Sequence, residues 1–214
     1  MNQGLFDYLR DFNSKERFFL VGQALGNPGF KISREFRNEL AAVLHLQIPE
    51  VSFCAMDFHL DWLYASLQLN ANNGKKEIHS NDAGIIKGQQ EDVDLLVGYQ
   101  VDNTYHIIIV EAKAFTGWTN SQMDSKADRL REIFGDNGNR WQHVFPHFLL
   151  MSPKKPVQLQ TARWPKWMIQ KTQGGQPAPA WIKLQVPSTQ IRVSRCDKNG
   201  KPNTKGDYWT IIDR

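Results

Sequence analysis

The middle of the chain has the pattern of hydrophobic and polar residues that is typical of paired β-strands. Residues 93–100 and 105–114 are rich in β-branched and aromatic side chains, and the polar dipeptide Asp102-Asn103 lies between them. Two such runs joined by a short polar turn predict a β-hairpin. Residues 107–110 are all apolar, which is typical of a central strand that is covered on both faces.

Two helices are predicted on either side of this hairpin in the sequence. Ser33 is a suitable N-cap for an amphipathic helix over residues 33–45. A second helix over residues 119–134 has apolar side chains three and four positions apart and ends before Gly135. Residues 144–151 predict another strand, and a strand, a helix and a strand in this order indicate a right-handed crossover with a parallel pair. We therefore expect an α/β protein with a mixed central sheet.

The rest of the chain gives less regular patterns. We expect a single domain in which residues 1–32 form an N-terminal helical segment, residues 33–151 form the core and residues 152–214 form an irregular basic extension. Residues 51–70 fit either a strand or a buried helix, because periodicity does not separate the two for a short apolar run.

Composition narrows the class of protein. The 214 residues are 41% hydrophobic and 22% charged, which indicates a folded domain with a real core rather than a disordered chain. The two cysteines lie far apart and give no disulfide framework, which suits a reducing cytosol. No apolar stretch is long enough to span a bilayer, and the acidic first residues do not resemble a signal peptide. A cytoplasmic protein without a membrane partner is therefore expected.

The charge is unevenly distributed along the chain. Residues 1–153 hold 14 basic and 19 acidic side chains, whereas residues 154–214 hold 12 basic and 3 acidic ones. An acidic body of net charge −5 is thus followed by a basic part of +9. Basic segments are a typical footprint of contact with a polyanion such as nucleic acid, and the alternative is a solvated basic surface.

The basic part also holds tryptophans and a second predicted hairpin, which joins residues 191–195 to residues 208–212. Aromatic rings suit nucleobases and basic side chains suit phosphates; the alternative is that the tryptophans cover the core, which we favour for Trp181 and Trp209. The tryptophans are Trp164, Trp167, Trp181 and Trp209.

The candidate chemistry lies at the ends of the first hairpin. If residues 102–103 form a two-residue turn, the register places Asp94 opposite Glu111 and Asp92 opposite Lys113, all on one face. Opposed β-carbons lie ~5 Å apart, so two carboxylates there repel each other. A divalent cation removes that repulsion, and Mg²⁺ prefers one or two carboxylates together with waters and phosphates. The alternative is a surface hairpin with an Asp92–Lys113 ion pair and a solvated Asp94.

These residues resemble a known motif. Asp94-Leu-Leu-Val on one strand and Glu111-Ala112-Lys113 ending the next are similar to the PD-(D/E)xK nucleases, the restriction-endonuclease-like superfamily, with Val93 where the motif's name has proline. The resemblance covers residues 33–151 in the family's order of helix, three-stranded meander, crossover helix and strand. It implies a restriction-endonuclease-like core and metal-dependent hydrolysis of phosphodiester bonds, in DNA more often than RNA.

The resemblance also implies roles for the residues of the motif. Asp94 and Glu111 would ligate Mg²⁺, for which Mn²⁺ substitutes, and the carbonyl oxygen of Ala112 would assist. Lys113 would be the catalytic lysine, which polarises the attacking water or stabilises charge on the phosphate. A homodimer would suit the cutting of both strands of DNA.

Two further residues are candidates for the same site. Many family members carry an acid on the helix before the sheet, which makes Glu39 a candidate metal-shell or water-orienting group; the alternative is a boundary residue paired with Arg34 or Arg37. Some members carry a glutamine near the start of the crossover helix, where Gln122 would orient substrate or water. The alternative for Gln122 is a capping box with Thr119.

Lys126 and Arg129 extend the same helical face and would contact phosphate or be solvated. Two other functions stay open: a non-catalytic nucleic-acid-binding module that keeps the fold, and a protein-interaction module whose basic tail binds an acidic partner.

Overall fold

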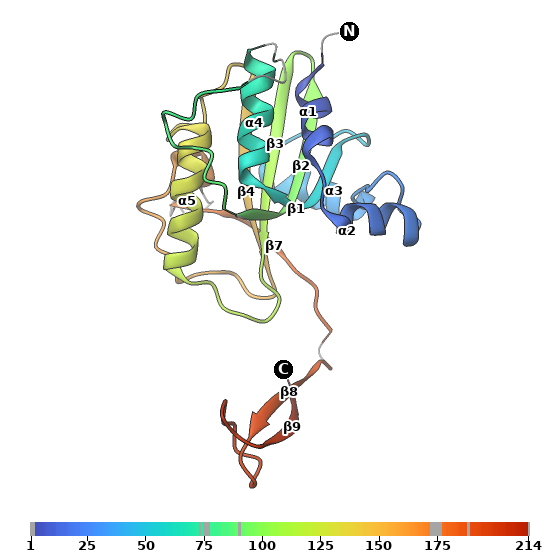
Figure 1. Ribbon diagram of the computed structural model, residues 1–214, viewed down its shortest axis with the longest axis vertical. Helices are drawn as coiled ribbons and strands as arrows, with labels where there is room; N and C mark the ends of the chain where they lie inside the picture. Colours follow the sequence, from blue (N-terminus) through green and yellow to red (C-terminus); the bar gives the residue numbers. More distant parts are fainter. Residues whose placement is uncertain are drawn as a thin grey trace.

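A five-stranded mixed β-sheet forms the centre of the protein in its computed structural model (Figure 1). β1, β2 and β3 form an antiparallel meander, and β4 and β7 continue the sheet parallel to β3. The strands of the sheet are β1 (Phe53–His59), β2 (Asp92–Val101), β3 (Thr104–Ala112), β4 (Val144–Ser152) and β7 (Ala180–Lys183). The structure describes residues 3–72, 74, 78–89, 91–171, 177–187 and 189–213.

Helices cover both faces of the sheet (Figure 1). α1, α4 and α5 pack on one face through a core that includes Leu9, Leu63 and Leu130. α3 covers the other face with Leu40 and Leu44, next to α2 and the π-helical turn η1. The helical elements are α1 (Leu5–Phe12), α2 (Glu16–Phe19), η1 (Leu20–Ala24), α3 (Arg34–Leu44), α4 (Leu60–Ala71), α5 (Asn120–Phe134) and the 3₁₀ turn η2 (Lys166–Met168).

Local side-chain chemistry fixes the ends of the predicted elements. The Ser33 hydroxyl accepts a hydrogen bond from Phe36 N at 3.1 Å, so α3 begins where the sequence predicts. Thr119 caps α5 in the same way, and Gly135 follows that helix with φ of 80°, in the left-handed region that favours glycine. Asp102 has φ of 53° in the β2–β3 turn, which is therefore the predicted two-residue turn. The predicted α/β class with a mixed sheet is confirmed.

Residues 51–70, which the sequence left undecided, form both kinds of element. β1 ends at His59, and α4 begins at Leu60. The change occurs there because Nδ1 of His59 accepts a hydrogen bond from Asp61 N at 3.2 Å and caps the new helix. Periodicity alone does not predict a strand and a helix joined without a loop.

The expected extension over residues 152–214 divides into two parts. The first part contributes to the core, because β7 pairs with β4 and because Trp164 and Met168 are buried against the sheet. Trp181 packs against the same core, as predicted. This part also contains the short strand pair β5 (Gln170–Lys171) and β6 (Pro177–Ala178).

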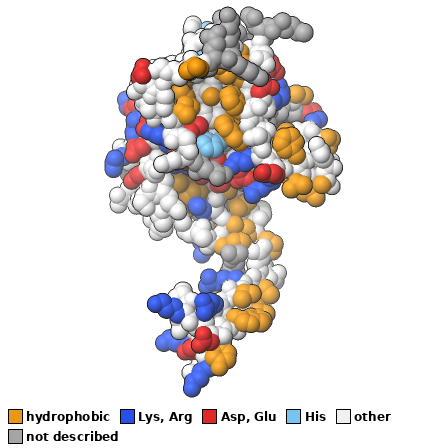
Figure 2. Space-filling model, viewed as in Figure 1, with side chains coloured by type: hydrophobic (Ala, Val, Ile, Leu, Met, Phe, Trp, Pro, Cys, Tyr) orange, Lys and Arg blue, Asp and Glu red, His pale blue; other side chains and the backbone are white. Residues whose placement is uncertain are grey.

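The predicted second hairpin is confirmed and stands apart from the core. β8 (Ile191–Cys196) and β9 (Tyr208–Asp213) pair only with each other among the described strands (Figure 1). The interpretation of Trp209 as a core residue is wrong, because its side chain is 66% exposed. Figure 2 shows apolar side chains along one edge of this hairpin and Lys and Arg side chains elsewhere on it.

No helix within the described ranges is long and apolar enough to cross a membrane.

Gly98→Ala is expected to lower the free energy of unfolding by about 1–3 kcal/mol. A Cβ at Gly98 in β2 would meet Cε1 of Phe6 at 2.5 Å. The Phe6 ring is held between Phe53 and Tyr105, with ring centroids 6.4 Å and 5.5 Å away, so it has little room to move. Urea denaturation measures the effect. Gly117→Ala is the control, because nothing lies within 4 Å of its added Cβ; equal losses in both variants would contradict the expectation.

Candidate active site

Asp94 and Glu111 lie where the β2–β3 ladder ends. The ladder keeps the predicted register from the turn as far as Leu95 opposite Val110, and Asp94 and Glu111 are the next residues on each strand. Instead of continuing the ladder, Oδ2 of Asp94 accepts a hydrogen bond from Ala112 N at 2.6 Å. This hydrogen bond holds the carboxylate of Asp94, on β2, against the end of β3.

Beyond this point the two strands diverge. Asp92 pairs with His59 of β1, and its carboxylate forms an ion pair with Lys15 at 2.9 Å. Lys113 has left β3 and donates its backbone N–H to Met151 O of β4 at 2.8 Å. The predicted strand pairing of Asp92 with Lys113 is therefore wrong. At this end of the sheet β2 stays paired with β1, and the chain after β3 stays hydrogen-bonded to β4. The divergence leaves Glu111 and Lys113 at the split between the strands.

A local rotation of β2 accompanies the split. Leu95 packs towards α3, whereas Val93, two residues earlier, packs in the core on the opposite face of the sheet. In a regular strand both would share one face, so the strand rotates at Asp94. β1 does the same at Asp57, which has φ of 51° and forms an ion pair with Arg17.

Glu111 is a buried carboxylate with charged neighbours. It is 8% exposed, and burial raises its pKa from the ordinary 4.5 to about 7. Lys126 opposes this shift, the negative charge of Asp94 adds to it, and Lys113 lowers the pKa to a smaller degree. The charges of Asp94 and Lys113, two other predicted site residues, thus act on Glu111, and a second lysine, Lys126, contacts it.

Lys126 is the site residue whose role the sequence left undefined. Its Nζ lies 3.2 Å from Oε1 of Glu111, and it also donates a hydrogen bond to the backbone carbonyl of Asp92. Its helix α5 is fixed over the sheet by the buried residues Met123 and Ala127, on either side of Lys126 in the sequence. The signal available in the sequence was a lysine next to buried positions of the crossover helix. The interpretation of Lys126 as a solvated residue is wrong.

Glu39 and Gln122 are not brought to this pair of acids. Glu39 is exposed on α3, and the side chain of Gln122 is exposed on the first turn of α5. The backbone N–H of Gln122 donates to the Thr119 hydroxyl at 3.4 Å, which supports the capping interpretation. In the part of the chain that the structure describes, no three His, Cys, Asp or Glu side chains form a group that could hold a metal ion.

Arg129 is buried between α5 and α4 and does not lie on the surface. It is 4% exposed and forms ion pairs with Asp61 and, at 3.0 Å, with Glu132. Asp61 in turn accepts hydrogen bonds from the backbone N–H groups of Lys87 and, at 2.8 Å, Gly88. The interpretation of Arg129 as solvated or phosphate-binding is therefore wrong; it ties α5 to α4 and to the loop before β2.

The raised pKa of Glu111 predicts that stability depends on pH. Between about pH 4.5 and pH 7 the folded protein holds a proton on Glu111 that the unfolded chain has released. The free energy of unfolding should therefore fall as pH rises through this window, by up to about 3 kcal/mol, and level off above it.

Glu111→Gln, which does not ionise, should remove this dependence. Thermal unfolding from pH 5 to pH 8 should show the variant gaining stability over the wild type as pH rises. Glu35→Gln, at an exposed position on α3, is the control. Parallel curves for Glu111→Gln and the wild type would refute the assigned pKa.

Comparison of the chain with family models, with curated proteins and with solved structures finds no match to any of them.

Proposed function

We propose that the protein is a metal-dependent nuclease that hydrolyses phosphodiester bonds of nucleic acid, DNA in preference to RNA. The observation that carries the proposal is the pair Asp94 and Glu111, which influence each other's charge at the split between β2 and β3 beside Lys113 and Lys126. Burying a carboxylate next to a second one works against stability, so such a pair is a candidate functional site.

The residues of the pair fit a divalent cation. Mg²⁺ is commonly held by only one or two carboxylates, with waters and substrate phosphates completing its shell. Oε1 of Glu111 is buried, and its contact with Lys126 is an ion pair without good hydrogen-bond geometry. Asp94, Glu111 and the carbonyl oxygen of Ala112 would hold Mg²⁺ or Mn²⁺. When bound, such an ion lowers the pKa of a water and offsets charge on the phosphate.

The two lysines have different tasks in this proposal. Lys113 follows directly after β3, where its ammonium group orients the attacking water and stabilises negative charge that develops on the phosphate. Lys126 balances the charge of Glu111 when that carboxylate ionises, above about pH 7. The ion pair holds the carboxylate of Glu111 in place. When a cation and the substrate phosphate are bound, they would balance the charges of this carboxylate and of Lys126.

The order of elements supports the same class. α3, the meander β1–β3, the crossover helix α5 and the parallel strand β4 follow one another as in restriction-endonuclease-like proteins, with α4 inserted after β1. We propose that this is the fold family, and that the acids at the ends of β2 and β3 correspond to its motif.

A non-catalytic nucleic-acid-binding module is the second candidate. It is favoured by the Lys126–Glu111 ion pair, which already neutralises the buried carboxylate, and by the exposed position of Glu39. Such a module would bind DNA with strong salt dependence but would not cleave it with any divalent cation.

Cleavage assays with Lys113→Ala test the proposal. Wild-type protein should cleave DNA with Mg²⁺ or Mn²⁺ and not with EDTA, and the variant should be slower by about a hundredfold. Lys31→Ala removes an exposed lysine away from the site and should leave the rate unchanged. Cleavage at equal rates by all three proteins would exclude the assignment, and binding without cleavage of DNA or RNA would favour the second candidate.

A further inference from the structure

A pocket of about 560 Å³ opens beside the candidate active site. Its walls come from the segments that follow β3, β4 and β7, three strands that run parallel, so it lies outside their carboxyl ends. That edge is where open α/β sheets usually bind ligands. Lys113 lines the pocket, and its charge acts on Glu111, so a molecule in the pocket would adjoin the reacting phosphate.

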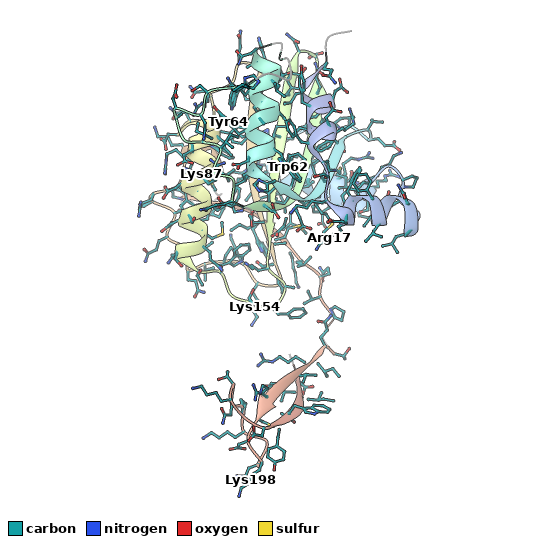
Figure 3. All side chains as sticks on the ribbon, in the orientation of Figure 1. Arg17, Trp62, Tyr64, Lys87, Lys154 and Lys198 are labelled. Carbon is teal, nitrogen blue, oxygen red and sulfur yellow. The ribbon has the colours of Figure 1, made fainter. Side chains whose placement is uncertain are left out.

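The walls of the pocket combine positive charge with aromatic rings. Lys113, Lys154 and Lys155 line it, and no acidic side chain does so among the described residues. Phe115 and Trp118 supply rings from the loop between β3 and α5. Figure 3 shows Lys154 at the lower end of the core, on the side that faces the β8–β9 hairpin.

Trp118 is a largely buried ring in the wall of the pocket. Its side chain is 8% exposed, and its indole Nε1 is buried without a hydrogen-bond partner among the described residues. Leaving a buried N–H without an acceptor costs about 1–3 kcal/mol. That nitrogen has no exposed surface, so a ligand in the pocket would contact the ring of Trp118 and not its N–H.

We propose that this pocket binds one nucleotide of the substrate, next to the phosphate that is cleaved. The base lies against the rings of Phe115 and Trp118, and the lysines contact the phosphate. A pocket of this size lies in the usual range for small molecules. In a ligand that combines an anionic group with a flat ring, the anion would pair with the lysines and the ring would stack on the aromatic side chains. This inference rests on the proposed function, since it assigns the nucleotide to the same substrate.

The test uses metal-free full-length protein and a deoxynucleoside 5′-monophosphate. Seven tryptophans give seven indole N–H signals in a ¹⁵N-correlated NMR spectrum, and the signal lost in Trp118→Phe identifies Trp118. The monophosphate should shift this signal, and the nucleoside without phosphate should bind about tenfold more weakly. Inorganic phosphate alone should leave the indole signal in place.

The double variant Lys154→Gln/Lys155→Gln, both at exposed positions, should weaken the binding of the monophosphate at least about fivefold. Lys198→Gln/Lys201→Gln removes the same charge from the β8–β9 hairpin, where Figure 3 shows Lys198 at the far tip, and should change it less than about twofold.

The outcomes separate this inference from the proposed function. An unmoved Trp118 signal, or equal weakening by both double variants, would overturn the pocket even if cleavage depends on Lys113. Binding at Trp118 in a protein that cleaves nothing would support the pocket and overturn the nuclease.

Discussion

Glu111→Gln is expected to lower the rate of metal-dependent DNA cleavage at least about a thousandfold. The substitution keeps the size of the side chain but removes one of the two negative charges that Asp94 and Glu111 present. A cation held by one carboxylate instead of two binds more weakly, and the charge on Lys126 then has no partner in the buried site. Single-turnover cleavage at saturating Mn²⁺ separates a loss of chemistry from a loss of metal affinity.

The control for this variant is Glu35→Gln on α3, an exposed acid that makes the same chemical change away from the site. It should cleave at the wild-type rate. Thermal unfolding of both variants at the pH of the assay shows whether a slow rate reflects unfolding. Wild-type rates in both variants would show that Glu111 takes no part in catalysis.

Arg129→Met is expected to lower the free energy of unfolding by about 3–5 kcal/mol, the largest stability effect that we predict. Arg129 is 4% exposed, and its removal leaves the buried carboxylate of Asp61 without its charged partner. Methionine approximates the length of the arginine stem, so the loss reflects the uncompensated charge rather than a large cavity.

Arg131→Met on the same helix is the matched control. Arg131 is more exposed and pairs with Asp128 and Asp136 on the surface, where ion pairs contribute at most about 1 kcal/mol. Urea denaturation of both variants measures the difference. Similar small losses in the two would show that the Asp61–Arg129 contact does not tie α5 to α4.

The sequence predicted the elements whose signals are local. The two-residue turn at Asp102 sets the hairpin register, and with it the neighbouring positions of Asp94 and Glu111. Ser33 and Thr119 mark the starts of α3 and α5 because a capping hydroxyl acts within three residues. The sequence could identify the pair of acids at the strand ends because their positions follow from the register that the local turn sets.

Other features depend on contacts between distant segments, which a local pattern does not contain. The divergence of β2 from β3 follows from the pairing of Asp92 with β1 and of Lys113 with β4. Lys126 reaches Glu111 only because α5 packs across the sheet. β7 joins the sheet as a four-residue strand within a proline-containing segment, too short to give a recognisable period. The interpretation of Trp209 as a core residue is wrong because composition does not distinguish a detached hairpin from a core strand.

The central claim is that Asp94 and Glu111 share one divalent cation. A crystal structure of the protein soaked with Mn²⁺, with anomalous diffraction to locate the ion, tests it most directly. The account predicts an anomalous peak bonded to oxygen atoms of both carboxylates beside Lys113. A Mn²⁺ ion well occupied elsewhere, with that position empty, would contradict it.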